Sequence, residues 1–306
     1  MGEAEYRRAE TALWGSVGLS PSETRVGLAR LGASVRVQEV GEGEPVLFVH
    51  GSPAAGATWA VMLAELGGLR RIVVDNPGAG LSEPITLTPD TADDYYSYYV
   101  TDLMDALGLE RAHVVASSLG GALALCAAGR DPARFASMVL MGGPWMAPGR
   151  AVPAAERLML LPGAGAVLGR LPMPRSMMVA SLRGIGHGAS IDAGRIPEPW
   201  WAWNDALVRH TDTFGNDCRL VRAFRGSGLS YAPRWQITLD ELARIEVPTL
   251  AVWGADDTDV DASTGRAMAD ALPHGRIEVL PGSGHLPWID YPDQVANLVR
   301  GHVTST

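Results

Sequence analysis

Three kinds of side chain in this 306-residue chain have the chemistry of a nucleophile, a base and an orienting acid: Ser118, His285 and the aspartates within residues 256–259. A serine hydroxyl is a weak nucleophile until a base removes its proton, and histidine can accept and return a proton near neutral pH. A carboxylate beside the imidazole holds it in the required tautomer and stabilises its cation. Side chains of these types predict acyl transfer from a substrate to the serine and then to water.

Ser118 lies at a predicted bend between a strand and a helix. The apolar residues 114–116 indicate a buried strand, and residues 119–128, which are rich in Ala and Leu, indicate a helix. A serine at such a bend exposes its hydroxyl at the carboxyl edge of the sheet. The N–H of the following residue points the same way, toward any negative charge that forms there.

The bend also distinguishes Ser118 from its neighbour Ser117. The turn is so tight that the positions two before and two after the nucleophile must be small. For Ser118 these positions are Ala116 and Gly120, which meet the condition. For Ser117 they are a valine and a leucine, which are too large. Ser118 is therefore the predicted nucleophile.

The candidate acid and base also follow predicted strands. The aspartates follow a strand predicted at residues 248–254, and His285 follows the last predicted strand, at residues 275–280. The carboxyl ends of parallel strands share one edge of a sheet, which is where ligands bind in open α/β sheets. The order Ser, Asp, His along the chain is one known arrangement of a catalytic triad.

Apolar runs alternate with helical segments through most of the chain. Strands are predicted at residues 32–40, 45–49, 71–74, 114–116, 135–141, 248–254 and 275–280. Residues 32–40 alternate apolar and polar, which predicts an edge strand with one solvated face, whereas the continuous apolar runs are typical of buried parallel strands. Thr88 and Pro89 predict the start of a helix that runs to Ala106. The pattern predicts an α/β fold with a mostly parallel, doubly wound sheet.

The alternation stops between residues 145 and 234. This stretch is rich in Pro and Met and contains segments of helical period. It is predicted to be a helical cap inserted into a core domain of residues 32–144 and 235–306. Residues 1–31 mix helical signals with a turn and are expected to form a peripheral N-terminal extension.

Composition restricts the partners of the chain. Its formal charge of −9 disfavours nucleic acid and anionic membranes, and all 25 basic residues are arginines. The polar N-terminus and the lack of a long apolar segment predict a cytoplasmic protein that does not span a membrane. Cys126 and Cys218 show no metal-binding spacing. No metal or organic cofactor is expected.

Five motifs together resemble those of α/β-hydrolase-fold enzymes. They are His50-Gly51, Asp75-x-Pro-Gly-x-Gly-x-Ser82, the bend at Ser118, Gly254-x-x-Asp257 and Gly284-His285. They lie in family order between about residues 35 and 295. The resemblance implies a serine hydrolase with a helical cap, and it selects Asp257 as the acid because that residue lies three after the glycine. Asp256 and Asp259 are then expected to be solvated or capping carboxylates. Ala116 stands where the family usually has glycine.

The resemblance also implies an oxyanion hole made by the backbone N–H groups of Ser52 and Leu119. Loss of one such donor typically raises the reaction barrier by about 3 to 4 kcal/mol. His50 is expected to be structural, and so is the tight turn that contains Asp75 and Ser82. The histidines outside these motifs are expected to be surface or packing residues: His113, His187, His210, His274 and His302.

The cap is expected to cover the site with apolar, adaptable side chains. The predicted pocket residues are Trp145, Met146, Met177, Met178, Trp200, Trp201, Phe214 and Trp288. The alternative for each of them is that it packs in the core of the cap itself. A serine nucleophile argues against epoxide hydrolases and haloalkane dehalogenases, which use a carboxylate in this fold. The first expectation is therefore an esterase or lactonase that acts on a small, largely apolar substrate through an acyl-enzyme.

Two other functions remain open from the sequence. A carbon–carbon bond hydrolase of a dicarbonyl compound would use the same three residues, and Trp288 resembles a position that some of these enzymes use. A non-hydrolytic member, such as a natural-product cyclase or a ligand receptor, is the third possibility, although many such members lose a triad residue. Nucleotide binding is excluded because the glycine-rich turns lack the phosphate-binding spacing after the first strand. The sequence does not define the substrate or the oligomeric state.

Overall fold

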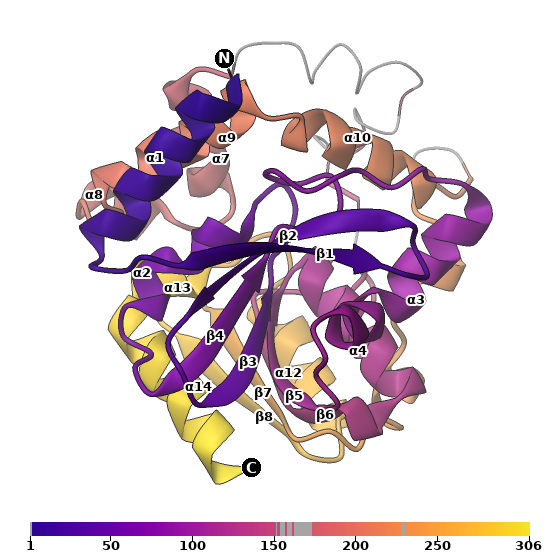
Figure 1. Ribbon diagram of the computed structural model, residues 1–306. Coiled ribbons are helices and arrows are strands. Elements are labelled where there is room, and N and C mark those ends of the chain that lie inside the picture. The colour runs from indigo at the N-terminus through magenta and orange to yellow at the C-terminus, as the bar shows by residue number, and fades with distance from the viewer. Residues whose placement is uncertain (1, 151, 154–156, 158–160, 162–172, 228–229) are drawn as a thin grey trace.

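The apolar runs of the sequence form the central sheet of the computed structural model, which describes residues 2–150, 152–153, 157, 161, 173–227 and 230–306 (Figure 1). The strands are β1 (Ser22–Leu28), β2 (Ala33–Val40), β3 (Glu44–Val49), β4 (Leu69–Val74), β5 (Ala112–Ser117), β6 (Phe135–Met141), β7 (Thr249–Gly254) and β8 (Gly275–Leu280). Their order in the sheet is β1-β2-β4-β3-β5-β6-β7-β8. Neighbours from β4 to β8 run parallel, whereas β1 and β2 pair antiparallel. The predicted α/β fold with a mostly parallel sheet is confirmed.

Helices cover both faces of this sheet. They are α1 (Gly2–Ser16), α2 (Ala60–Leu63), α3 (Pro89–Ala106), α4 (Leu119–Arg130), α11 (Leu239–Leu242), α12 (Ala262–Ala271), α13 (Pro287–Asp290) and α14 (Pro292–Ser305), with short 3-10 helices at Gly56–Trp59, Pro132–Arg134 and Pro233–Trp235. Residues of α3, α4, α11 and α12 share one apolar core, and those of α2, α13 and α14 share the other. Within β3, Leu47 and Val49 enter the first core while Val46 and Phe48 enter the second. Burial on both faces explains the apolar runs of the central strands β3, β5, β6 and β7, whereas the edge strand β8 alternates half-buried and exposed residues.

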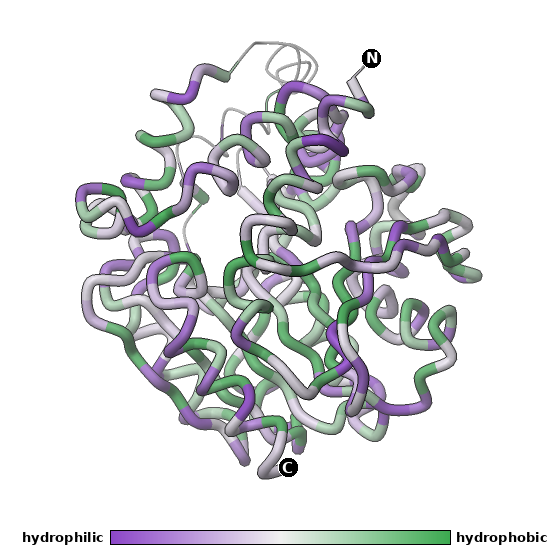
Figure 2. The backbone as a smooth tube through the Cα atoms, turned by 60° about the vertical axis from the view of Figure 1, so that its left-hand side comes forward, coloured by the Kyte–Doolittle hydropathy of each residue, from purple (hydrophilic) through white to green (hydrophobic). Residues whose placement is uncertain are grey.

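Hydropathy follows this layered arrangement. Figure 2 shows hydrophobic residues gathered along the central strands and hydrophilic residues along the outer helices and loops. In the part of the chain that the structure describes, no helix is long and apolar enough to cross a membrane.

The structure corrects two expectations for the N-terminal part of the chain. Strand β2 was expected at an edge, but it lies between β1 and β4. Its polar residues Arg36 and Gln38 are buried because α1 covers them, and Glu10 of α1 bonds to both side chains. Residues 1–31 were expected to be peripheral, but β1 is itself a strand of the sheet and α1 packs on α9.

Further helices lie between β6 and β7. They are α7 (Arg175–Gly184), α8 (Gly188–Asp192), α9 (Glu198–His210) and α10 (Thr213–Ala223), and we refer to residues 173–223 as the helical insertion. Figure 1 shows it at the top of the view, where α9 lies beside α1. Of the cap predicted at residues 145–234, residues 151, 154–156, 158–160, 162–172 and 228–229 lie outside the described residues.

Candidate active site

The bend between β5 and α4 has the geometry that the sequence predicts. Ser118 has φ 50° and ψ −116°, and it is the one non-glycine residue with positive φ in the described part of the chain. Such a conformation costs about 1–3 kcal/mol and persists only where surrounding contacts impose it. A Cβ on Gly120 would lie 2.2 Å from the carbonyl oxygen of Val49, so β3 approaches the start of α4 too closely for a side chain.

The loop that follows β3 lies directly against this bend. A Cβ on Gly51 would lie 2.8 Å from the Cβ of Ser118. Ser52 follows in the same loop, and Leu119 follows the serine in the bend. These are the two residues predicted to supply oxyanion N–H groups, and both line the same pocket.

Asp257 and His285 form a buried pair at the ends of β7 and β8. Nδ1 of His285 lies 2.8 Å from Oδ2 of Asp257 and must carry the proton, because a carboxylate only accepts. The other carboxylate oxygen of Asp257 accepts from the N–H groups of Asp259 and Val260, at 2.9 and 3.2 Å. The carboxylate is therefore fixed, and Nε2 of His285 is left to act as the base.

The loop after β6 contacts the surroundings of Ser118, Asp257 and His285. A Cβ on Gly142 would lie 3.2 Å from Nδ1 of His285, and a Cβ on Gly143 would lie 2.0 Å from Val260, in the loop of Asp257. The N–H of Trp145 donates to the carbonyl oxygen of Ser118 at 3.1 Å. Ser118, Asp257 and His285 thus gather around one short segment. Among the described residues, the imidazole of His285 is hydrogen-bonded to Asp257 and not to Ser118 Oγ.

The electrostatic surroundings favour the protonated form of His285. Burial lowers the pKa of its imidazole, but the charge and hydrogen bond of Asp257, with a smaller contribution from Asp259, raise the pKa above its ordinary value of 6.5. The positive charge of Arg150 lowers the pKa of His285 and so opposes the effect of the two carboxylates. The balance gives a histidine that accepts a proton readily.

The structure corrects the expectation that Asp259 is solvated. Its side chain is only 12% exposed and lies between two partners. Oδ1 lies 2.7 Å from Nη2 of Arg150, and Oδ2 lies 3.9 Å from Nε2 of His285. A second carboxylate therefore lies on the side of the imidazole that must exchange protons with the serine. Sequence reasoning missed this pair because its two members are 109 residues apart.

Two predicted structural motifs are confirmed. Nε2 of His50 accepts from the N–H of Asn76 at 2.9 Å, and Nδ1 lies 2.6 Å from the carbonyl oxygen of Gly51. Burial lowers the pKa of His50 to about 4, so it is neutral. The carboxylate of Asp75 accepts from the N–H of Gly56 at 2.8 Å, and its turn is closed by the hydroxyl of Ser82.

His187 has a larger part in the site than its sequence context indicated. It lies between α7 and α8, is fully buried, and its Nδ1 lies 2.9 Å from the carboxylate of Asp290. Its Nε2 accepts from the N–H of Leu286 at 3.1 Å, and the N–H of His285 donates to the carbonyl oxygen of Ile185. The helical insertion is therefore bonded directly to the loop that carries His285. The other four histidines outside the motifs are surface or packing residues, as expected: His113, His210, His274 and His302.

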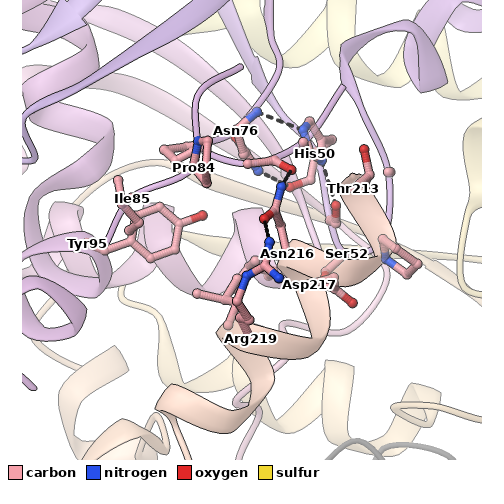
Figure 3. Close-up of a pocket in the computed structure, with 18 of the residues that line it drawn as sticks. His50, Ser52, Asn76, Pro84, Ile85, Tyr95, Thr213, Asn216, Asp217 and Arg219 are labelled. Atoms are coloured by element: carbon pink, nitrogen blue, oxygen red, sulfur yellow. Dashed lines mark hydrogen bonds between the residues drawn. The ribbon is translucent and has the colours of Figure 1, made fainter. Parts of the chain in front are cut away.

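A pocket with a cavity volume of about 40 Å³ opens beside the bend (Figure 3). Its walls come from the loop after β3, the loop after β4, Tyr95 of α3 and one face of α10. The side chains of Thr213, Asn216 and Leu220 bring α10 to this wall. In the described residues, no group of three or more His, Cys, Asp and Glu side chains could hold a metal ion.

None of the eight side chains predicted to line a pocket lines this one. Trp200 and Trp201 of α9 and Met178 of α7 are buried in the core that α1 shares. Trp145 and Met146 are buried in the opposite core, Met177 is 56% exposed and Phe214 is half-buried.

Trp288 is also absent from the residues that line the pocket. Its side chain is buried, its Nε1 donates to the carbonyl oxygen of Thr58 at 3.0 Å, and its ring lies 4.2 Å from that of Trp59. Six of the eight side chains are therefore buried in the two cores that flank the sheet, and not in a core of the cap alone. Apolar character alone does not separate a core position from a pocket wall.

Comparison with known proteins supports the fold that the structure shows. A family model described as the alpha/beta hydrolase family matches residues 46–298. The chain is 29% identical over 259 residues to the 2-hydroxy-6-oxononadienedioate/2-hydroxy-6-oxononatrienedioate hydrolase of Paraburkholderia phymatum, a match that covers 82% of this chain and 84% of the relative. It is 29% identical over 271 residues to the 2-hydroxy-6-oxo-6-phenylhexa-2,4-dienoate hydrolase of Comamonas testosteroni, covering 86% and 89%.

Solved structures show the same fold. The carboxylesterase CesB (YbfK) from Bacillus subtilis matches with a TM-score of 0.71 at 18% sequence identity, covering 100% of this chain and 99% of that chain. The likeness therefore extends over the helical insertion as well as the sheet.

Proposed function

Since the chain belongs to the alpha/beta hydrolase family, we propose that it is a serine hydrolase with Ser118 as nucleophile, His285 as base and Asp257 as the orienting acid. The observation that carries this proposal is the 2.8 Å hydrogen bond between Asp257 and His285, at the sheet end where the strained Ser118 lies. Nδ1 is occupied by this bond, so Nε2 is the nitrogen that accepts the serine proton.

The proposed reaction is hydrolysis of a carbon–carbon bond in a dicarbonyl compound. The names of the two relatives describe hydrolases of 2-hydroxy-6-oxo compounds. Such a compound has a ketone and an enol but no ester or amide, so water can only cleave a carbon–carbon bond beside its ketone. Similarity over more than four fifths of the chain supports this reaction over simple ester hydrolysis.

In the proposed mechanism, the enol proton of the substrate first moves to the carbon beside the ketone, which turns the enol into a second carbonyl. Ser118 Oγ then attacks the ketone carbon while His285 takes the serine proton. The N–H groups of Ser52 and Leu119 bind the resulting oxyanion. The carbon–carbon bond then breaks, its electron pair moves toward the second carbonyl through the conjugated chain, and His285 returns the proton to the leaving fragment. Water hydrolyses the acyl-enzyme with His285 again as base, and Asp257 stabilises the imidazolium in both steps.

We assign the helical insertion, within residues 145–234, the role of a cap over this site. Thr213, Asn216 and Leu220 of α10 contribute to the pocket wall, which supports that role. The bond from His285 to Ile185 also supports it, because it ties the insertion to the catalytic loop. Water exclusion under such a cap strengthens the electrostatic contacts of the intermediate.

Hydrolysis of a neutral ester or lactone is the second candidate, and the carboxylate of Asp217 in the pocket wall favours it. Asp217 lines the pocket and is 9% exposed, whereas Arg219 is exposed and donates to the side chain of Asn216. The carboxylate of Asp217 disfavours a substrate carboxylate placed beside it, and the names of both relatives' substrates include carboxylates, although the guanidinium of Arg219 lines the same pocket. A small, largely apolar ester meets no such repulsion.

A direct assay separates the two candidates. Wild type and Ser118→Ala are given 2-hydroxy-6-oxo-6-phenylhexa-2,4-dienoate, with benzoate as the measured product, and p-nitrophenyl butanoate in parallel. We expect wild type to release benzoate and Ser118→Ala to lose at least about 10³-fold in rate. Wild type that cleaves only the ester supports the second candidate. Undiminished activity of Ser118→Ala contradicts the triad assignment in either case.

A further inference from the structure

Helix α3 buries three tyrosines whose hydroxyl groups have different surroundings. The hydroxyl of Tyr96 donates to the carbonyl oxygen of Trp235 at 2.7 Å, and that of Tyr99 donates to Oδ1 of Asn76 at 2.9 Å. Tyr95 is 1% exposed, and its hydroxyl bonds to no group in the part of the chain that the structure describes. One of three similar side chains thus lacks a partner.

This unpartnered hydroxyl faces the pocket beside Ser118. Tyr95 lines the pocket together with Ser52 and Leu119. Figure 3 shows the Tyr95 hydroxyl directed from α3 into the pocket, toward the side where Asn216 lies. Buried polar groups of native proteins are nearly always hydrogen-bonded, and an unpaired one is costly. A hydroxyl left unpaired at a pocket wall therefore indicates that its partner belongs to a ligand.

The charge nearby limits what that ligand group can be. Burial raises the pKa of Tyr95 above its ordinary range, and the negative charge of Asp217 raises it further, so the phenol stays protonated and can donate. The same carboxylate disfavours a second anion in this part of the pocket. The hydroxyl of Ser52 is also buried and without a partner among the described residues. The wall is therefore suited to a neutral oxygen that accepts hydrogen bonds.

We propose that Tyr95 is a specificity-determining residue that donates a hydrogen bond to the second, neutral oxygen of a dicarbonyl substrate. The first carbonyl oxygen then lies at the N–H groups of Ser52 and Leu119, in the same pocket. The proposal rests on the proposed function, since it assumes that the reacting carbonyl is held beside Ser118. It narrows the substrate class to compounds with a carbonyl or enol oxygen in addition to the reacting one.

The competing explanation is that Tyr95 is only a core residue. Its ring lies 5.2 Å from that of Tyr99, so the side chain does contribute to packing. Stability tests whether the Tyr95 hydroxyl is unpaired in the protein alone, and ligand binding separates the two explanations. Tyr95→Phe keeps the ring and removes an unpaired hydroxyl, so its Tm should equal or exceed that of wild type. The matched control Tyr96→Phe leaves the carbonyl of Trp235 without its donor, and its Tm should fall by about 2–4 °C.

A ligand bound beside Ser118 should slow the labelling of this residue by a fluorophosphonate. The ligand concentration that halves the labelling rate therefore measures binding. The probes are 1-phenylhexane-1,5-dione and 1-phenylhexan-1-one, which differ by the second carbonyl. In wild type and Tyr96→Phe, the dione should protect at concentrations about tenfold lower than the monoketone. In Tyr95→Phe, the two probes should protect at similar concentrations. An unchanged tenfold advantage in Tyr95→Phe overturns the proposal.

A thermal-shift measurement with the same probes tests the role of Tyr95 without relying on the labelling of Ser118. Failure of the Tyr95 proposal can then be distinguished from failure of the proposed function. If Ser118 is not labelled by the fluorophosphonate, the proposed function fails. The Tm of each variant with and without the dione then still reports on Tyr95. We expect the dione to raise the Tm of wild type and Tyr96→Phe by more than that of Tyr95→Phe. An equal rise in all three proteins overturns the role of Tyr95.

Discussion

At the scale of single residues, the groups around His285 decide when it can act as a base. Asp257 bonds to Nδ1, and Asp259 lies 3.9 Å from Nε2 with Arg150 behind it. Burial lowers the pKa of His285, but the two carboxylates raise it above 6.5 overall. Only the neutral imidazole accepts the proton of Ser118. Activity should therefore fall as the pH drops through this raised pKa.

Asp259→Asn should move the acid limb of the kcat/KM profile to lower pH. The substitution removes a negative charge near Nε2, which destabilises the imidazolium and lowers the pKa of His285. Arg150→Met should move the limb to higher pH, because the loss of its positive charge stabilises the imidazolium. Asp256→Asn, an exposed neighbour in the same loop, is the control and should leave the limb unchanged. An identical acid limb for Asp259→Asn and wild type would contradict this role of the second carboxylate.

Residue patterns predicted the local motifs of the site better than its long-range partners. The bend at Ser118 and the pair of Asp257 and His285 could be predicted because each motif is a short segment at the end of a strand. The bond from His187 to Asp290 joins residues 103 positions apart, and nothing in the spacing of either residue indicates it. Most of the predicted pocket aromatics lie in the two cores, and residue type could not indicate this because an apolar side chain is equally suited to a core and to a pocket wall.

At the scale of elements, the bend depends on how closely β3 approaches the start of α4. Gly120 and Gly121 are adjacent in the first turn of the helix but meet different surroundings. A Cβ on Gly120 would lie 2.2 Å from the carbonyl oxygen of Val49, whereas the nearest atom to a Cβ on Gly121 is Cγ of Pro144, at 3.7 Å. Only the first position excludes a side chain.

Gly120→Ala should therefore lower the free energy of unfolding by about 3 kcal/mol or more, since backbone carbonyls cannot move aside easily. Gly121→Ala, the matched control, should leave stability unchanged or raise it by up to about 1 kcal/mol, because alanine favours a helix. Urea unfolding followed by circular dichroism measures both. Equal stability of the two variants would show that β3 does not press on the helix.

Most elements were predictable because the central parallel strands β3, β5, β6 and β7 are buried on both faces and contain apolar runs. The prediction that β2 lies at an edge of the sheet is wrong for a physical reason. Its alternating pattern is the usual mark of one solvated face, but α1 supplies a carboxylate to Arg36 and so buries that face. The sequence indicates the proposed cap boundary only by the end of the alternation between strands and helices.

At the scale of the whole molecule, α1 connects the helical insertion to the sheet. Nε1 of Trp203 on α9 donates to the hydroxyl of Tyr6 at 3.3 Å, and Tyr6 donates to Glu10 at 2.9 Å. Glu10 pairs with Arg36 of β2, and Arg36 also lies 3.3 Å from Asp75. This buried chain of polar contacts ends at the turn that supports the loop beside the active site.

Arg36→Met should destabilise the protein by about 3–5 kcal/mol, because it leaves the buried carboxylates of Glu10 and Asp75 without their cation. Arg70→Met is the matched control on the neighbouring strand. Arg70 pairs with Glu39 at 2.8 Å, but both side chains are partly exposed, so its loss should cost about 1 kcal/mol or less. Urea titration of both variants measures the difference. Similar losses in the two would argue against α1 as a structural connection.

The most direct test of the central claim is to identify the residue that a fluorophosphonate modifies, by peptide mass spectrometry of wild type, Ser118→Ala and Ser117→Ala. Ser117 is the matched control because it is adjacent and fully buried. The account predicts a single label on Ser118 in wild type and in Ser117→Ala, and no label in Ser118→Ala. A label on another residue, or equal labelling of Ser118→Ala, would contradict the assignment of Ser118 as the nucleophile.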